Sequence, residues 1–162
     1  MAGRDARPTV RKSKMALDYD PAIIGKVFEE TDPVAVSVQE IKDFCTAIGE
    51  TNPWYTDEEA ARKGPYGGLT APPLFVLTFR NGRHFFQNIP HFGKGGFDAG
   101  RDVEFVNPVR PGDQIKLVSH VKETYEKTGR SGAMYFVTIR STVHNQKNEV
   151  VAHIDHRFMG RL

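Results

Sequence analysis

Residues 73–79, which read Pro-Leu-Phe-Val-Leu-Thr-Phe, set the architecture of this chain. Proline is well placed at a first helical position, and the residues that follow are apolar on nearly every face. A helix that is apolar all round is a buried helix, so we expect this segment to lie at the centre of the domain. The helix becomes more polar at Arg80, Arg83 and His84, which predicts that its far end reaches solvent.

After this helix the pattern of apolar residues changes from one typical of a helix to one typical of strands. A glycine-rich segment from Phe92 to Gly100 predicts a flexible loop. Apolar and polar residues then alternate in four segments, which predicts four antiparallel strands joined by turns. The segments are Arg101–Val109, Gln114–Lys127, Ala133–His144 and Glu149–Phe158. One buried helix followed by a meander long enough to wrap it predicts an α+β domain.

Capping signals predict two further helices upstream of the buried one. Ser37 and Glu40 have the spacing of a capping box, and Gly49 suits the end of the helix that the box begins. A second box at residues 56–59 predicts a short helix that ends near Gly64. Between residues 23 and 36 the pattern indicates an entry segment and one or two strands.

Length and composition favour a single domain and exclude several kinds of protein. The chain has 162 residues, 39% of them hydrophobic, and we place the folded domain at residues 17–162. Residues 1–16 are basic and nearly free of large apolar side chains, which predicts a flexible tail. A net charge of +2 does not favour nucleic acid as a partner, and no apolar run suits membrane insertion or a secretory leader. The single cysteine, Cys45, excludes an internal disulfide, so a cytoplasmic location is the default expectation.

Four motifs in a fixed order resemble those of the MaoC-like enoyl-thioester hydratases. Residues 49–57 read Gly-Glu-Thr-Asn-Pro-Trp-Tyr-Thr-Asp, where that family has Gly-Asp-x-Asn-Pro-x-His-x-Asp. Residues 103–113 are similar to the family's Phe-x-x-Pro-Val-x-x-Gly-Asp signature, and residues 145–151 to its final hairpin. The resemblance extends from residue 22 to residue 158. It implies a hotdog fold, in which an antiparallel β-sheet wraps around a long central buried helix.

The fourth motif, Tyr-Gly-Gly-Leu-Thr-Ala-Pro-Pro at residues 66–73, is closer to the FAS1-like dehydratase domains, also called MaoC N-terminal domains. Some of these are the partner subunit of heterodimeric hydroxyacyl-thioester dehydratases and help to form the acyl channel. The resemblance therefore implies a subunit of an (R)-specific enoyl-thioester hydratase or 3-hydroxyacyl-thioester dehydratase. Its ligand would be an acyl thioester of coenzyme A or acyl carrier protein, with no cofactor and no metal.

We expect this subunit to form a homodimer, or a heterodimer with a MaoC-type catalytic subunit. A single hotdog domain leaves a sheet edge and one face exposed, and a second chain usually covers them.

The residues that carry the chemistry in this family are replaced in this chain. In the family the Asp and His act as the acid/base pair, and a backbone N–H at the start of the central helix stabilises the thioester oxygen. Here Glu50 and Tyr55 stand at the Asp and His positions, and a tyrosine with a reference pKa of about 10 is a poor base. Pro73 stands at the position of the donor glycine, and proline has no N–H. We therefore expect the chain alone to be a weak or inactive hydratase.

The candidate catalytic residues are thus Glu50 and Tyr55, and each has a structural alternative. Glu50 would otherwise be a solvated carboxylate at a helix end, and Tyr55 a packed ring whose hydroxyl bonds to the backbone. The candidate substrate-binding residues are Asn52, Trp54, Gly68, Ala71, Pro73, Arg80 and Arg83. Asn52 alternatively holds the Asn-Pro turn, and Trp54 alternatively packs in the core. The two arginines would meet a phosphate of the carrier, or simply form a solvated helix end.

The roles of the histidines remain open, as do two alternative functions of the chain. His156 shares a strand face with apolar residues and is either a core imidazole or a lining residue, whereas His153 points to the opposite face. His84 and His91 flank the glycine-rich loop, where either would be able to approach a ligand. The chain is alternatively a self-sufficient homodimeric hydratase with a variant acid/base set. A third possibility is a protein that binds acyl thioesters without turning them over.

Overall fold

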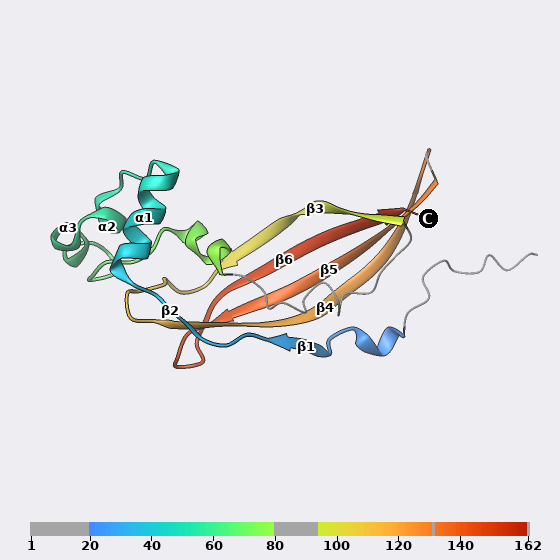
Figure 1. Ribbon diagram of the computed structural model, residues 1–162, viewed down its shortest axis with the longest axis horizontal. Coiled ribbons are helices and arrows are strands. Elements are labelled where there is room, and N and C mark those ends of the chain that lie inside the picture. Colours follow the sequence, from blue (N-terminus) through green and yellow to red (C-terminus); the bar gives the residue numbers. More distant parts are fainter. Residues whose placement is uncertain (1–19, 80–93, 131, 162) are drawn as a thin grey trace, which may run out of the picture.

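The computed structural model describes residues 20–79, 94–130 and 132–161. Nearly half of these residues form an antiparallel sheet, and the three α-helices gather at one end of it (Figure 1). The elements are η1 Pro21–Ile23, β1 Val27–Glu30, β2 Val34–Ala35, α1 Val38–Ile48, α2 Pro53–Thr56, α3 Glu58–Arg62, η2 Pro73–Thr78, β3 Lys94–Phe105, β4 Gln114–Gly129, β5 Gly132–His144 and β6 Val150–Arg161. The strand order is β1-β4-β5-β6-β3, and β2 pairs with β4.

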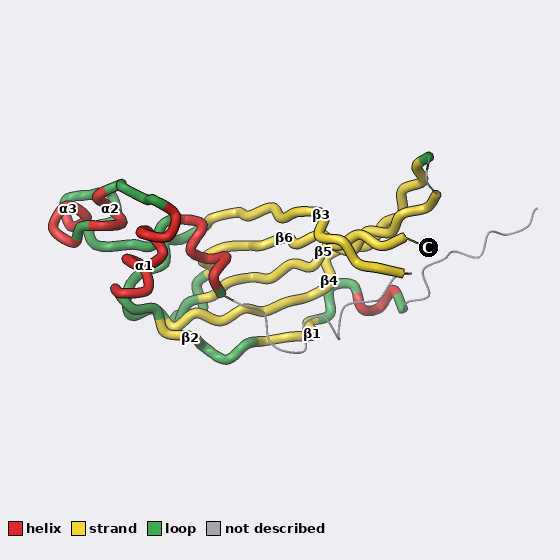
Figure 2. Tube along the Cα trace, turned by 45° about the horizontal axis from the view of Figure 1, so that its top comes forward, coloured by secondary structure: helices red, strands yellow, loops and turns green. Residues whose placement is uncertain are grey.

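The predicted meander is confirmed in β4, β5 and β6. β4 and β5 pair from Lys116↔His144 to Gly129↔Gly132, and β6 lies on the other side of β5. Val137, Ile139 and Val143 alternate along β5 and are at most 1% exposed, because they point to the face that packs in the core. Figure 2 shows these long strands running away from the helical end.

The predicted flexible loop at residues 92–100 is wrong for residues 94–100, which belong to β3. β6 continues to Arg161, so this segment has a neighbouring strand to pair with, and Phe97 pairs with Met159. The register shifts between Lys94 and Gly96 and again between Asp98 and Arg101. Such bulges accommodate glycine within a paired strand, which explains why a glycine-rich segment is a strand here. At its other end β3 stops at Phe105, four residues before the predicted end.

The helix signals are confirmed at α1 and partly wrong at α3. Ser37 Oγ accepts from Glu40 N at 3.1 Å, Ser37 N donates to the Glu40 carboxylate at 2.7 Å, and Gly49 ends the helix with φ +70°. At α3 the capping residue is Asp57 instead of the residue before it. Asp57 Oδ1 accepts from the backbone N–H of Glu59 and Ala60 at 2.8 and 2.9 Å. The preceding threonine already belongs to α2, which begins at its own proline.

The predicted central helix begins at Pro73, but among the described residues it is the 3₁₀ helix η2 of 6 residues, which ends at Thr78 and is followed by an extended Phe79. Phe75 and Val76 are buried, but Leu74 is 53% exposed, so the prediction of burial on every face is wrong at Leu74. The further residues expected in this helix, Arg80, Arg83 and His84, lie outside the described residues, as do His91 and the basic tail.

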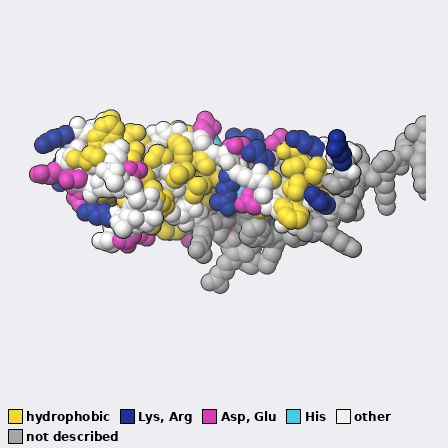
Figure 3. Space-filling view, turned by 90° about the horizontal axis from the view of Figure 1, so that it is seen from above, with side chains coloured by type: hydrophobic (Ala, Val, Ile, Leu, Met, Phe, Trp, Pro, Cys, Tyr) yellow, Lys and Arg dark blue, Asp and Glu magenta, His cyan; other side chains and the backbone are white. Residues whose placement is uncertain are grey.

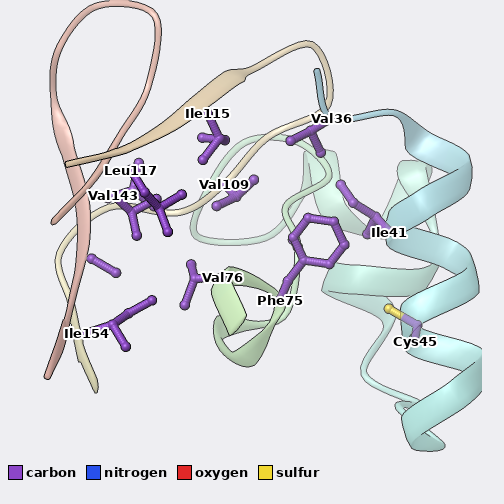
Figure 4. Close-up of a cluster of buried hydrophobic side chains, with 13 residues drawn as sticks. Val36, Ile41, Cys45, Phe75, Val76, Val109, Ile115, Leu117, Val143 and Ile154 are labelled. Carbon is purple, nitrogen blue, oxygen red and sulfur yellow. The ribbon is translucent and has the colours of Figure 1, made fainter. Parts of the chain in front are cut away.

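A single large apolar cluster joins η2 to both α1 and the sheet. In Figure 4 Phe75 points toward Ile41 on α1, and Val76 points toward the sheet side chains. A smaller cluster of Val121, Val137 and Ile139 lies further along the sheet, where Phe158 and two residues before α1 pack on it.

Figure 3 shows hydrophobic side chains gathered over the helical end and charged side chains of both signs over the middle of the molecule. Among the described residues no helix is long and apolar enough to cross a membrane.

Candidate functional site

A pocket of about 160 Å³ lies where α2, the start of η2 and the end of β3 meet. Its walls are mostly apolar, and its polar side chains are three hydroxyls and one amide. The lining residues are Tyr55, Tyr66, Thr70, Ala71, Pro72, Pro73, Val76, Phe105, Val106, Asn107, Pro108 and Val109. No charged side chain is among them. The predicted site residues Tyr55, Ala71 and Pro73 are thus brought together by the fold.

The segment at residues 66–73, which carries five of the twelve lining residues, is held by the turn after β3. Ala71 N donates to Val109 O at 2.9 Å, and the Arg110 guanidinium donates to Tyr66 O at 2.9 Å. Arg110 N in turn donates to the Asp113 carboxylate at 2.7 Å, which fixes the turn. The two family motifs at residues 66–73 and 103–113 therefore form one unit that shapes the pocket. Tyr66 was not among the predicted site residues, although its place before a pair of glycines in the motif was a usable signal.

Tyr55 lies in the pocket as a protonated phenol. Asn52 caps α2, because its Oδ1 accepts from Trp54 N at 3.0 Å, and this sets the direction of the Tyr55 side chain. Burial raises the pKa of Tyr55, and the neighbouring Tyr66 and Glu50 raise it further. Its hydroxyl has no hydrogen-bond partner among the described residues, so the expected bond to the backbone is not present there. Tyr55 can therefore donate a hydrogen bond at neutral pH, but it cannot serve as a base.

The Glu50 carboxylate binds backbone amides and does not line the pocket. Its Oε1 accepts from Thr51 N and Asn52 N, both at 2.9 Å, and Glu50 is not among the lining residues. This geometry matches the alternative of a carboxylate at a helix end. The carboxylate still acts through space, because it raises the pKa of Tyr55 and, after burial, that of Cys45.

The other predicted binding residues lie away from the pocket lining. Trp54 is 42% exposed and is not in the core. Its ring packs on Gly64, where a Cβ would lie 2.9 Å from the indole Cδ1, so any side chain at that position would require the ring to move. Gly68 lies beside the Arg110 guanidinium, and Asn52 caps α2. Arg80 and Arg83 lie outside the described residues.

A second hollow of about 440 Å³ lies on the other side of η2, between β2 and α1. It is largely apolar, with Phe44, Phe75 and Phe79 in its wall and the carboxylates of Glu40 and Asp43 among its lining. Phe75 faces this hollow, whereas the adjacent Val76 lines the first pocket. The two hollows are therefore separated by a single turn of η2.

His156 is a buried imidazole and lines neither of these hollows. It is 9% exposed, its Nε2 lies 3.0 Å from Asp98 Oδ2, and its ring packs on Phe158. Burial lowers the pKa of His156, while the Asp98 carboxylate acts in the opposite direction. His153 lies on the opposite face as expected, with Nδ1 3.2 Å from Thr142 Oγ1. Of the two readings of His156, the structure supports the core imidazole.

Thr70 supplies a test of this site that does not depend on any ligand. It is 0% exposed, and its Oγ1 has no hydrogen-bond partner among the described residues. Thr70→Val replaces this hydroxyl with a methyl group of similar volume, so we expect the free energy of unfolding to rise by about 1 kcal/mol. Urea denaturation measures the change, and Thr70→Ser, which keeps the hydroxyl, is the control. A lower stability for Thr70→Val would show that the hydroxyl is paired.

Comparison with known proteins places the chain in a family. Residues 22–154 match the FAS1-like dehydratase domain region. A UPF0336 protein from Streptomyces avermitilis is 33% identical over 145 residues, which cover 85% of this chain and 90% of that protein. A probable enoyl-CoA hydratase alpha subunit from Thermomonospora curvata is 30% identical over 146 residues, which cover 80% of this chain and 45% of that protein.

Solved structures agree with this placement. A MaoC-like dehydratase from Rhodospirillum rubrum superposes with a TM-score of 0.66 at 26% identity, covering 84% of this chain and 90% of that one. The HadBC 3R-hydroxyacyl-ACP dehydratase complex from Mycobacterium tuberculosis gives a TM-score of 0.70, covering 85% and 97%, and at 24% identity this likeness shows the fold alone. The fold is thus the hotdog fold of the MaoC-like dehydratases. Within that class, the chain belongs to the FAS1-like dehydratase family.

Proposed function

We propose that this chain is a subunit of an (R)-specific enoyl-thioester hydratase or 3-hydroxyacyl-thioester dehydratase. It would help to shape the channel for the acyl group, and a MaoC-type partner would supply the acid/base pair. The ligand would be an acyl thioester of coenzyme A or acyl carrier protein. The relative from Thermomonospora curvata, a probable enoyl-CoA hydratase alpha subunit, supports both the reaction class and the role of a subunit.

The observation that carries this proposal is a pocket at the motif positions whose described lining residues include no base. Hydration of an enoyl thioester needs a base for water, an acid for the α-carbon and a donor for the thioester oxygen. In this pocket Tyr55 stays protonated and Pro73 has no N–H, while Glu50 lies outside the lining and is bound to backbone amides. The pocket is suited to hold an acyl thioester, whereas the proton transfers require residues of another chain.

The free edge of the sheet supports the need for a second chain. β3 is the last strand in the sheet order, so one row of its backbone groups has no neighbouring strand among the described residues. Phe97, Phe105 and Val106 lie on or just after this strand and are 52%, 47% and 49% exposed. An exposed strand edge with large apolar side chains is normally covered by a partner. Either a second copy or a MaoC-type subunit would cover it.

The test is hydration of crotonyl-CoA by the chain alone and after mixing with a MaoC-type protein of the same source that carries Asp-x-Asn-Pro-x-His. We expect little turnover alone and at least a tenfold rise in the mixture, equivalent to about 1.4 kcal/mol of transition-state stabilisation. Replacing the partner's Asp or His should abolish the activity of the mixture, while Glu50→Gln in this chain should leave most of it. Robust turnover by the chain alone that Glu50→Gln abolishes would instead establish a self-sufficient hydratase.

The same pocket favours one non-enzymatic alternative. A site that holds a thioester without a base also suits a protein that binds acyl thioesters and does not transform them. Calorimetry with acyl-CoA separates the two functions. Tight binding without turnover, even with the MaoC-type protein present, would support the binding protein.

A further inference from the structure

The described lining residues offer only a few side-chain donors to a ligand in the pocket. Asn107 Nδ2 is already used, since it donates to Val150 O at 2.7 Å. Thr70 Oγ1 is closed off from the surface. The hydroxyls of Tyr55 and Tyr66 remain, and neither has a hydrogen-bond partner among the described residues. Both rings line the pocket, and they are close enough for Tyr66 to affect the ionisation of Tyr55.

The backbone supplies little help at the same place. Pro72 and Pro73 line the pocket and have no N–H. The N–H of Ala71, the next lining residue, already donates a hydrogen bond to Val109 O at 2.9 Å. A carbonyl group buried in this pocket would cost free energy unless a side chain bonds to it.

We infer that Tyr55 and Tyr66 together bind the carbonyl oxygen of the acyl thioester and replace the backbone donor that Pro73 removes. This inference rests on the proposed function and adds the group by which the ligand is recognised. Two phenol hydroxyls in a pocket whose described lining residues carry no charge suit a neutral carbonyl better than a carboxylate or a phosphate.

Both phenols are held in place by the fold. The Asn52 cap and α2 orient Tyr55, and the Arg110 guanidinium fixes the backbone of Tyr66 at 2.9 Å. Such positioning is what a hydrogen-bonding site for a thioester oxygen requires. Glu50, which is near enough to raise the pKa of Tyr55, adds a negative charge that further disfavours an anionic group in the pocket.

The test compares two ligands in titration calorimetry with the full chain. One is butyryl-CoA, and the other is its thioether analogue, in which a methylene replaces the carbonyl. We expect Tyr55→Phe and Tyr66→Phe each to weaken binding of the thioester about fivefold to tenfold, the value of one hydrogen bond. Binding of the thioether should stay unchanged. Tyr125→Phe, which alters a stacked ring on the far part of β4, is the matched control and should leave both affinities unchanged.

The outcomes separate this inference from the proposed function. Equal weakening of both ligands would show that the rings only pack against the acyl or pantetheine chain, and no weakening would show that neither hydroxyl contacts the ligand. Either result overturns the inference while thioester binding by the wild-type chain stands. Failure of the wild-type chain to bind either ligand overturns the proposed function together with the inference. Thermal unfolding of each variant confirms that the Tyr→Phe proteins are folded.

Discussion

Phe75→Ala should lower the free energy of unfolding by about 4 kcal/mol, because it removes the side chain that joins η2 to α1. Phe75 is 4% exposed and packs edge-to-face on Phe44 at 5.4 Å and on Phe79 at 5.6 Å. A cavity at this place would also connect to the apolar hollow beside α1, whose wall Phe75 forms. Urea denaturation followed by circular dichroism measures the loss.

The adjacent residue provides a matched control for this change. Leu74 belongs to the same turn of η2 but is 53% exposed, so Leu74→Ala should change the stability by less than about 0.5 kcal/mol. A similar loss at both positions would contradict the arrangement described above. It would indicate that Leu74 is covered in the assembled protein, as a helix buried on every face requires.

The alternation of apolar and polar residues predicted the meander, because this alternation can be read within each strand without knowledge of its neighbours. The N-terminal half of β3 could not be predicted in this way. Its glycines indicate a loop when read alone, and only the pairing of Phe97 with Met159, 62 positions away, makes it a strand. In the same way, Leu74 is apolar in the sequence and yet exposed, because burial depends on which neighbours each side of η2 meets.

The site was predictable where a motif fixes a position in the fold. Tyr55, Ala71 and Pro73 line the pocket because their two motifs set them in α2 and at or just before the start of η2. Tyr66 was marked only by its place before the two glycines of its motif, and no local pattern reveals the contact from Arg110, 44 positions later, that holds its backbone. The role of Glu50 depends on hydrogen bonds within its own turn. The sequence does not show these bonds, so it could not decide between a catalytic and a capping role for Glu50.

The second large effect is expected at Asp155, on the sheet face opposite the core cluster. Its carboxylate accepts from Arg140 at 2.7 and 2.8 Å and from Lys122 at 2.6 Å. The Asp155 side chain is only 12% exposed, so its removal would leave two cations together without their anion. Asp155→Ala should therefore lower the free energy of unfolding by about 3 kcal/mol at pH 7.

Asp102 is the control, because it lies directly beside Asp155 on the neighbouring strand β3. It also forms an ion pair, with Arg157 at 2.9 Å, but its side chain is 68% exposed. Asp102→Ala should change the stability by less than about 1 kcal/mol, as is usual for a surface pair. Equal losses for the two variants would show that the Asp155 cluster is no stronger than a surface ion pair.

Acid titration tests the same cluster by a different route. Burial alone would raise the pKa of Asp155, but hydrogen bonds from Arg140 and Lys122 outweigh it and lower the pKa from 3.8 to about 2. A carboxylate with a lowered pKa stabilises the fold above its unfolded pKa, and this stability is lost as the pH falls toward the folded value. The wild-type protein should therefore lose about 2 kcal/mol between pH 4 and pH 2 through this one group. Asp155→Asn cannot titrate, so its stability should fall less steeply than that of the wild type over that interval. If Asp155→Asn keeps the full acid dependence, other carboxylates carry it and the cluster does not.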